Sequence, residues 1–435
     1  MEAEVPVEVS ETFETLLSNL KLDNDPIIVD RRDQITKALN TEFRSTESLI
    51  ANRLMVGSYG RYTAIRGVSD IDLLYILPSS LEGEYSSEDG PRKVLERVRE
   101  AIHARYTKTS IKVDRLVVVV QFTNFKFEVQ PVFKQADGSF SYPDTYAKKW
   151  KTTKPSDEIE ELKARNDITH GNLRKLCRYA RAWKNKHGVA INGLLIDTLA
   201  YNFVRSTSDF DSVGFGSHDR MVREFFQFLA DEPTQDRYAA VGSGQHVKVK
   251  ARFQSKARTA LALCDEAIAA GGKAKANTKW REVFGAQVPL ASDSLTASAS
   301  LPYRDTEEFI EDQYPVDISH TVTIDCTVTQ DGFRTKLLRQ MLAEHKWLSP
   351  RKHLDFRITE TSVAEPYTVR WKVLNRGDEA EARDCVRGQI DGPNRDKSGR
   401  HEQTSFRGEH YVEVYILKSG VVVARDGILV PIEAE

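Results

Sequence analysis

Asp70 and Asp72 stand two residues apart in a segment where polar and apolar residues alternate. In a β-strand, residues two apart point to the same side. The two carboxylates are therefore expected to project together, while Ile71, Leu73 and Tyr75 face the other side. Two ionised carboxylates this close repel each other, and a divalent cation between them removes that repulsion. The pair therefore indicates a site for a cation such as Mg²⁺.

A glycine-containing turn precedes the aspartates, with the sequence VGSYG at positions 56–60. Gly57 and Gly60 allow the backbone to approach a ligand closely, and Ser58 offers a hydroxyl and a backbone N–H. If a helix begins near Ser58, its first N–H groups can bind an anion. A phosphate-binding turn beside a cation-binding acid pair is typical of phosphoryl and nucleotidyl transferases.

The elements around these residues are predicted to form a small mixed α/β lobe. Helical patterns cover 8–20, 27–43 and 92–106, a polar loop covers 78–90, and strands are expected at 70–77, 116–122 and 125–133. On the last strand Glu128 lies on the face opposite Phe127 and Val129. Glu128 is thus a lone acid in an otherwise apolar strand pair. Asp114 is a competing acid, but it precedes its strand instead of lying within it.

Composition points to a protein of the reducing cytosol. The chain has 435 residues, a formal net charge of −2 and four scattered cysteines without a close pair, which argues against a zinc site or a disulfide framework. No run approaches the ~18 apolar residues of a membrane span, and the acidic N-terminus lacks the features of a signal peptide. We therefore expect a cytoplasmic localisation and no membrane partner.

The periodicity changes twice along the chain and predicts an α+β protein of several domains. A catalytic lobe is expected at 1–155, a helical lobe at 156–290, a small polar linker at 291–304 and a β-rich domain at 305–435. The last region contains short β-branched runs separated by turn residues, which favours an antiparallel sandwich.

With these residues in place, the chain resembles the nucleotidyltransferase superfamily of DNA polymerase β, 2′-5′ oligoadenylate synthase and cyclic GMP-AMP synthase. The signature is a Gly-Ser turn, an Asp-x-Asp strand and a third acid, matched here by Gly57–Ser58, Asp70–Asp72 and Glu128. The segments VGSYGRYTAIRGVSDIDLLYIL and NLRKLCRYARAWKNKHG are similar to the bacterial cGAS/DncV-like enzymes of CBASS anti-phage defence. The region from about 305, including EPYTVRWKVLNRGDEA, resembles the AGS-C sensor domain. The third acid is often Asp in relatives and is Glu here.

The resemblance implies a polymerase β-like core and a two-metal reaction that joins NTPs, with ATP or GTP expected, into a cyclic oligonucleotide and releases pyrophosphate. Asp70, Asp72 and Glu128 are then the catalytic residues and the ligands of Mg²⁺, with Mn²⁺ as the alternative ion. Gly57, Ser58, Arg181 and Lys184 would bind the nucleotide. The product would act on a downstream effector, and the C-terminal domain would bind a regulatory nucleotide.

Each of these residues also has an ordinary structural interpretation. Glu128 could be a salt-bridged rim residue, and Arg178, Arg181 and Lys184 could form a solvated basic face. Tyr201 could stack on a base but fits a buried core position better. In the β domain Trp371, Arg376, Arg387 and Arg407 are candidates to grip a nucleotide, with core packing equally plausible for Trp371.

Two other functions remain open at this point. The same metal site could transfer a nucleotide to a protein or a small molecule. The chain could also be a nucleotide-binding sensor, although a complete acidic triad argues against that alternative.

Overall fold

The computed structural model describes residues 7–270, 272–290, 306–329, 334–375 and 378–433. It divides into two compact units, the first made of Met1–Ala182 and Asn192–Leu261, the second of Trp183–Ile191 and Ala262–Glu435. Both units are described below by themselves. Helices and a mixed sheet occur in the first unit and antiparallel sheets in the second, which confirms the predicted α+β class. Within the described ranges, no helix is long and apolar enough to cross a membrane.

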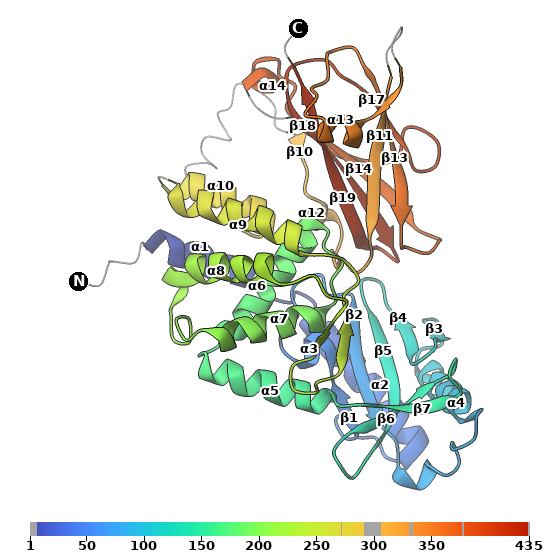
Figure 1. Cartoon of the computed structure of the whole chain (residues 1–435). Helices are drawn as coiled ribbons and strands as arrows, with labels where there is room; N and C mark the ends of the chain where they lie inside the picture. Colours follow the sequence, from blue (N-terminus) through green and yellow to red (C-terminus); the bar gives the residue numbers. More distant parts are fainter. Residues whose placement is uncertain (1–6, 271, 291–305, 330–333, 376–377, 434–435) are drawn as a thin grey trace. The chain divides into compact units, whose positions relative to one another are not determined.

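The first unit begins with helices, continues with a sheet and ends with a helical region (Figure 1). Its helices are α1 (Val7–Asn19), α2 (Asp25–Arg44), α3 (Gly57–Gly60), α4 (Gly90–Arg105), α5 (Pro155–Ile168), α6 (Asn172–His187), α7 (Gly193–Ser206) and α8 (His218–Asp231). Its strands are β1 (Arg53–Met55), β2 (Asp70–Ile76), β3 (Ser110–Val113), β4 (Val118–Gln121), β5 (Lys126–Lys134), β6 (Phe140–Asp144), β7 (Lys149–Thr153), β8 (Arg237–Ala239) and β9 (His246–Lys248). The last five residues of α6 belong to the second unit.

The central sheet is mixed, because β2 and β5 run parallel while the other pairs are antiparallel. Its strand order is β1-β2-β5-β4-β3, and β6 and β7 extend it from β5. The predicted strands β2, β4 and β5 and the tight turn before β5 are confirmed, and Phe122 N–H donates to Phe125 O across that turn at 2.9 Å. The strands β6 and β7 were not predicted.

One face of this sheet is closed by an apolar core. Ile71, Leu73 and Tyr75 of β2 and Phe127 and Val129 of β5 have no exposed surface. They pack with apolar residues of α2 and α4 in a single cluster. Burial of such side chains contributes about 1.5–3 kcal/mol each. This burial fixes the strand register, since a shift by one residue would turn the apolar side chains outward. The polar residues of β2 and β5 consequently lie together on the other face.

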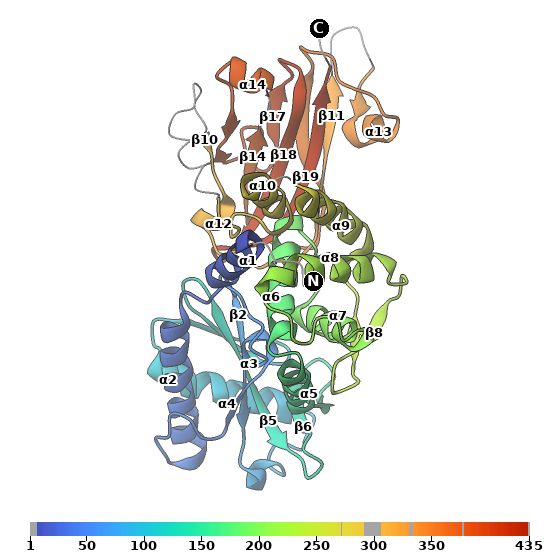
Figure 2. The same cartoon turned by 90° about the vertical axis from the view of Figure 1, so that its left-hand side faces the viewer.

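The helical region of the first unit contains α5, α7 and α8, grouped together in green in Figure 2. Asn192 caps α7 by accepting the N–H of Leu195 at 2.7 Å. The region predicted as a helical lobe also contains a short hairpin, formed by β8 and β9, which was not predicted. The division of this unit into lobes at residue 155 stays a prediction.

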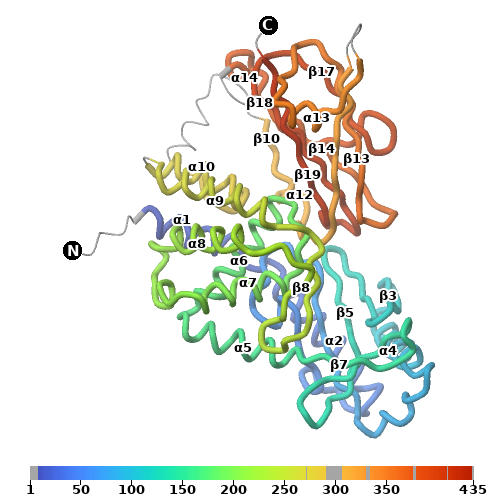
Figure 3. Tube along the Cα trace, in the orientation of Figure 1, coloured from blue at the N-terminus to red at the C-terminus, as the bar shows by residue number. Residues whose placement is uncertain are grey.

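The second unit is rich in β-strands and also contains helices of different lengths, and its chain trace can be followed in Figure 3. Its helices include α9 (Gln254–Ala269, which starts in the first unit), α10 (Lys273–Phe284), α12 (Ile310–Gln313), α13 (Leu338–Ala343) and α14 (Asp378–Ala382). Its strands are β10 (Thr306–Glu307), β11 (Val322–Thr329), β12 (Lys336–Leu337), β13 (His353–Thr361), β14 (Thr368–Leu374), β15 (Arg387–Gly388), β16 (Ile390–Asp391), β17 (Arg400–Gln403), β18 (Gly408–Lys418) and β19 (Val421–Ile432).

Two four-stranded antiparallel sheets share the core of the second unit. One has the order β12-β11-β13-β17 and the other β16-β14-β18-β19. Residues of both, among them Ile324, Phe356, Trp371 and Val414, form one buried cluster. The predicted sandwich-like domain is therefore confirmed. The predicted linker at 291–304 lies outside the described residues.

Candidate active site

The three predicted acids meet on the open face of the central sheet. The parallel register of β2 and β5 pairs Asp72 with Glu128 and Asp70 with Lys126. All four side chains leave the sheet on the same side, because the residues between them are buried on the other. The structure thus brings together Asp70, Asp72 and Glu128, as the sequence predicted.

Gly57 lies directly against this acid cluster. Its φ is +63°, and a Cβ placed on it would lie 1.9 Å from Asp72 Oδ2. The backbone on either side is also tied to β2, since Val56 N–H donates to Asp72 O at 3.1 Å. Only glycine permits both this conformation and this approach. The Gly-Ser turn and the acids therefore form one local structure, in which Gly57 begins the short helix α3 and Ser58 is its second residue.

The neighbouring carboxylates act on the pKa of Asp72. Burial, and then the neighbouring Glu128 and Asp70, raise the pKa of Asp72 to about 7, while Arg61 and Lys126 act in the opposite direction. Lys126 reaches into the cluster, and its Nζ lies 2.6 Å from Glu128 Oε1 and 3.5 Å from Asp70 Oδ1. Carboxylates this close repel each other when ionised, which favours a divalent cation.

The donor set of the cluster suits a hard divalent ion, because Mg²⁺, Mn²⁺ and Ca²⁺ prefer carboxylate oxygens. Among the residues that the structure describes, however, no three acidic, histidine or cysteine side chains converge in the way that a metal centre requires. The ammonium group of Lys126 lies between Glu128 and Asp70 instead. The carboxylates of the cluster therefore suit a divalent ion chemically, but such an ion would have to displace the Lys126 ammonium from between them.

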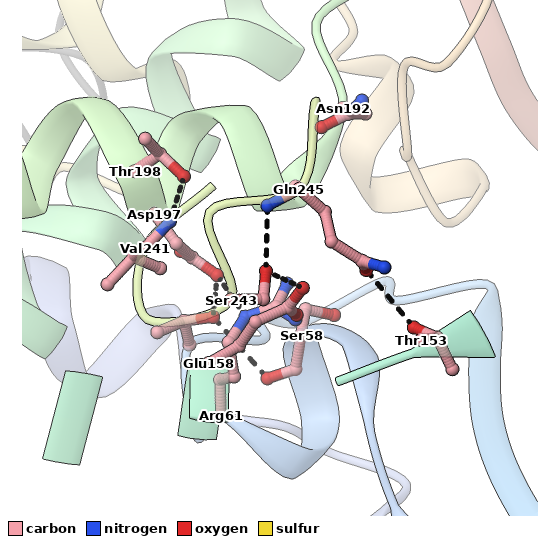
Figure 4. Close-up of polar contacts among 12 residues, drawn as sticks. Ser58, Arg61, Thr153, Glu158, Asn192, Asp197, Thr198, Val241, Ser243 and Gln245 are labelled. Carbon is pink, nitrogen blue, oxygen red and sulfur yellow. Dashed lines mark hydrogen bonds and ion pairs between the residues drawn. The ribbon is translucent and has the colours of Figure 1, made fainter. Parts of the chain in front are cut away.

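A second group of charged side chains surrounds Arg61, which follows the Gly-Ser turn. In this group the buried carboxylates are paired with arginines. Asp197 of α7 has no exposed surface and accepts from Arg61 Nε at 2.8 Å and from Arg181 Nη1 at 2.6 Å. Thr63 Oγ1 donates to the same carboxylate at 3.0 Å, and Arg61 also contacts Glu158 of α5 at 3.3 Å. Burial opposes ionisation, but Arg181 and Arg61 outweigh it and hold the pKa of Asp197 below its usual value. Figure 4 shows this network with Ser58, which lies one helical turn before Arg61.

The β8–β9 hairpin completes this network from its tip. Ser243 Oγ donates to Glu158 Oε1 at 3.0 Å, and Val241 N–H donates to Thr198 Oγ1 at 3.2 Å (Figure 4). Gly242 has a φ of +70°, and a Cβ there would lie 2.1 Å from Asp157 O. The hairpin tip, α5 and α7 are thus fixed against the segment that carries the Gly-Ser turn. We name Arg61, Glu158, Arg181, Asp197 and Ser243 the buried network.

The two predicted basic ligands are both engaged in ion pairs. Arg181 is 5% exposed and binds Asp197 through both terminal nitrogens. Lys184 belongs to the second unit, where its Nζ lies 3.0 Å from Asp317 Oδ1. A direct contact of either side chain with a triphosphate would require it to leave its carboxylate. Their role as nucleotide ligands stays a prediction.

The structure also shows the surroundings of three other residues that the sequence analysis considered. Tyr201 is 7% exposed and its hydroxyl donates to Glu161, so it is a core tyrosine. Arg178 is not simply a solvated residue, since its Nη2 donates to Tyr62 O at 3.1 Å. Asp114 is exposed at the end of β3 and accepts the N–H of Arg115. It does not contribute to the pKa shift of Asp72, in contrast to Glu128.

In the second unit, the described residues that were candidates for nucleotide binding differ in burial and in their contacts. Trp371 is fully buried and its Nε1 donates to Ser398 O at 2.9 Å, so it belongs to the core. Arg407 is exposed, and Arg376 lies outside the described residues. Arg387 lines an open cavity of about 580 Å³ and binds Glu402 at 2.6 Å.

Two family models match the chain. The model of the Second Messenger Oligonucleotide or Dinucleotide Synthetase (SMODS) domain matches residues 7–166, and that of the Adenylyl/Guanylyl and SMODS C-terminal sensor domain (AGS_C) matches residues 304–433. These matches identify the chain as a nucleotidyltransferase of the kind that makes oligo- or dinucleotide second messengers, with a C-terminal sensor domain. Both expected resemblances are confirmed.

Several solved structures are also similar to this chain, at low sequence identity. The E. coli MS115-1 CdnC in complex with HORMA-deltaN is 16% identical with a TM-score of 0.49, and the match covers 64% of this chain and 98% of that one. The Vibrio cholerae DncV cyclic AMP-GMP synthase with a linear intermediate is 14% identical (TM-score 0.46; 66% and 88% covered). The Rhodothermus marinus CdnE c-UMP-AMP synthase is 16% identical (TM-score 0.43; 60% and 98% covered). No relative was found among curated protein sequences. The family assignment therefore rests on the two domain models.

Sequence reasoning missed Lys126 and most of the buried network. Asp197 did carry a signal, because it is the one acid in the otherwise apolar stretch INGLLIDTLAYNF. A lone acid in a buried helix requires a cationic partner. Arg61 follows the Gly-Ser turn directly. Its position identifies it as the partner of Asp197 only once the turn and α7 are known to be in contact. Lys126 precedes Glu128 by two residues on the same strand face, which was readable from the sequence.

Proposed function

We propose that this enzyme condenses NTPs into a cyclic oligonucleotide with Mg²⁺ as its cofactor, releases pyrophosphate, and serves anti-phage signalling in the bacterial cytoplasm. The observation that carries the proposal is the packing of Gly57 against Asp72 beside Asp70 and Glu128, which joins the Gly-Ser turn to a cluster of candidate cation ligands. The family models support the class of reaction. The anti-phage role rests on the resemblance to CBASS enzymes.

In this proposal the chain positions the reactants and holds the cation. Asp70 and Asp72 hold the ion on the open face of the sheet, and Glu128 provides the further oxygens next to the acceptor ribose. A divalent cation bound there would lower the pKa of the attacking hydroxyl and neutralise charge on the departing pyrophosphate. The backbone at Gly57 and Ser58 contacts the phosphates. The buried network keeps the turn in place, and Arg181 acts through Asp197 as a positioning residue.

The test is to incubate purified protein with labelled NTPs, singly and in pairs, with Mg²⁺ or with Mg²⁺ replaced by EDTA, and to separate the products. We expect cyclic product and pyrophosphate with Mg²⁺ only, and no product from the Asp70→Asn/Asp72→Asn double variant. Label transferred to the protein itself or to an added acceptor would indicate the alternative nucleotidylation function. Wild-type turnover by the double variant would refute the site.

We also propose that the second unit binds a nucleotide in its open cavity. The cavity of about 580 Å³ has the size of small-ligand pockets. It is lined by Asn375, Asp384, Arg387, Glu402 and Gln403. Within the described residues, the buried Nε atom of Arg387 has no hydrogen-bond acceptor. An anionic ligand would supply one.

Calorimetric titration of the full-length Asp70→Asn/Asp72→Asn variant with mono-, di- and cyclic nucleotides tests this second proposal, because its catalytic metal site is disabled. We expect one remaining nucleotide site that is lost on Arg387→Met. The exposed Arg407→Met serves as the matched control. Binding that survives Arg387→Met would place the ligand elsewhere.

A further inference from the structure

Lys126 lies beside the predicted metal ligands. Among the ion pairs of the described residues, it is the one basic residue that contacts them. It opens β5, where the register sets it beside Asp70 and two residues before Glu128. Its Nζ lies 2.6 Å from Glu128 Oε1 and 3.5 Å from Asp70 Oδ1. Its backbone is fixed as well, because Lys126 N–H donates to Ser69 O at 2.8 Å. The ammonium therefore bridges acids from two adjacent strands.

The surroundings of this ammonium favour its charged form. A lysine side chain is charged at neutral pH, and Glu128 and Asp70 both lie within ion-pair distance of this one. The guanidinium of Arg61 is held by Asp197 and Glu158. Lys126 is thus the side chain that offsets part of the repulsion among the three carboxylates.

The position of the ammonium also explains why the acids do not converge as a metal centre in this structure. A Lys ammonium is a compact point charge with three donors, and it takes the place between carboxylates that a small cation would take. Glu128 and Asp70 point toward it. A divalent ion and the ammonium cannot both lie between the same oxygens, since their charges repel at this distance.

We propose that Lys126 is a built-in counter-ion of the acid cluster, which a divalent cation must displace from Glu128 and Asp70 before the site can work. This inference rests on the proposed function, because it assumes that the cluster binds a metal. Occupation of the site is then an exchange of one cation for another. The exchange weakens the affinity for metal in the absence of nucleotide, so that the empty enzyme holds its acids in a neutralised, inactive arrangement.

The alternative is an ordinary salt bridge between neighbours on one strand face, which leaves metal binding unchanged. Mn²⁺ binding to the full-length protein without nucleotide separates the two, measured by calorimetry and by the EPR signal of unbound Mn²⁺. Lys126→Met keeps the length of the side chain and removes its charge. We expect it to bind Mn²⁺ about tenfold more tightly than the wild type, which corresponds to about 1.4 kcal/mol. Lys134→Met, at the exposed end of the same strand, should leave the affinity unchanged.

The increase of the melting temperature on addition of Mn²⁺ gives a second measurement, and Lys126→Gln a second variant if Lys126→Met folds poorly. We expect a larger increase for either variant than for the wild type. Unchanged or weaker Mn²⁺ binding by both variants would overturn the proposal. Product formation from NTPs with unchanged Mn²⁺ affinity would refute this inference alone. Absence of both product and Mn²⁺ binding in the wild type and in both variants would refute the proposed function with it.

Discussion

Two buried aspartates of the first unit, Asp72 in the acid cluster and Asp197 in the buried network, are surrounded in opposite ways. Asp197 is matched by two arginines and a threonine hydroxyl, and its pKa is lowered. Asp72 lies beside two further carboxylates, with Lys126 paired to Glu128 and Asp70, and the pKa of Asp72 is raised to about 7.

The difference separates structural from chemical acids. A buried carboxylate that only holds a fold is accompanied by enough donors to stay ionised, because an unpaired buried charge is costly. A cluster left short of positive charge reduces the stability of the folded chain, and such an arrangement persists where a ligand supplies the missing charge. The contrast predicts that variants of the cluster lower activity without lowering stability, and that variants of the network lower stability.

The largest effect is expected for Glu128→Gln in the acid cluster. Turnover should fall by about 10²–10³-fold, because a ligand of the reaction's cation is weakened at the place where charge develops. NTP binding should change little. Initial rates of pyrophosphate release and NTP titration measure the two quantities, with the exposed Glu160→Gln on α5 as the matched control. Equal activity of both variants would move the third-acid role elsewhere, with Asp114 as the first residue to test.

Asp197→Asn should act on stability. The variant leaves Arg61 and Arg181 buried with too few negative partners, and we expect the free energy of unfolding to drop by about 3–5 kcal/mol. Denaturant titration measures it. Asp167→Asn is the control, because Asp167 forms an exposed pair with Lys163 in which the two side chains are 58% and 64% exposed. A loss no larger than that of the control would remove the distinction between cluster and network.

Asp72→Asn in metal-free buffer should have the opposite sign and raise the melting temperature at pH 8 by about 2–4 °C, since it relieves repulsion worth about 1 kcal/mol. The folded-state pKa of about 7 lies above the usual 3.8. The stability linked to the neutral carboxyl is therefore complete below pH 4 and lost as the pH rises through 7. The advantage of the variant should accordingly shrink between pH 8 and pH 4. Melting curves across this range in EDTA check it, and a variant less stable than the wild type at pH 8 would contradict the interpretation.

The smallest effect is expected for Ser243→Ala at the hairpin tip. It removes one hydrogen bond to Glu158 and should reduce the free energy of unfolding by about 1 kcal/mol. Ser87→Ala in the exposed loop is the control. A pronounced loss of turnover without loss of stability would assign the hairpin tip to the acid cluster instead.

Periodicity was enough to predict the acid face of the sheet. The alternation around Asp70 and Glu128 determines which side chains share a face, and the burial of Ile71 and Phe127 follows from it. The strands β6 and β7 and the β8–β9 hairpin escaped prediction. They are short, and their pairing is decided by neighbours, such as Trp150 packing on Phe133, that the local sequence does not reveal.

The sequence by itself determined the chemistry of the acid cluster, because its members lie on two strands with a two-residue repeat and a glycine turn beside them. Only the tertiary structure decided what the basic residues do. Arg181, which was predicted to bind the nucleotide, pairs with Asp197 of another helix, and Lys126, which had no predicted role, reaches the acids where β2 pairs with β5. The physical reason is that two carboxylates close together on one strand repel each other in any fold, so the sequence alone indicates that they need a cation. A lysine or arginine side chain is long and flexible, and only the fold decides which acid it reaches.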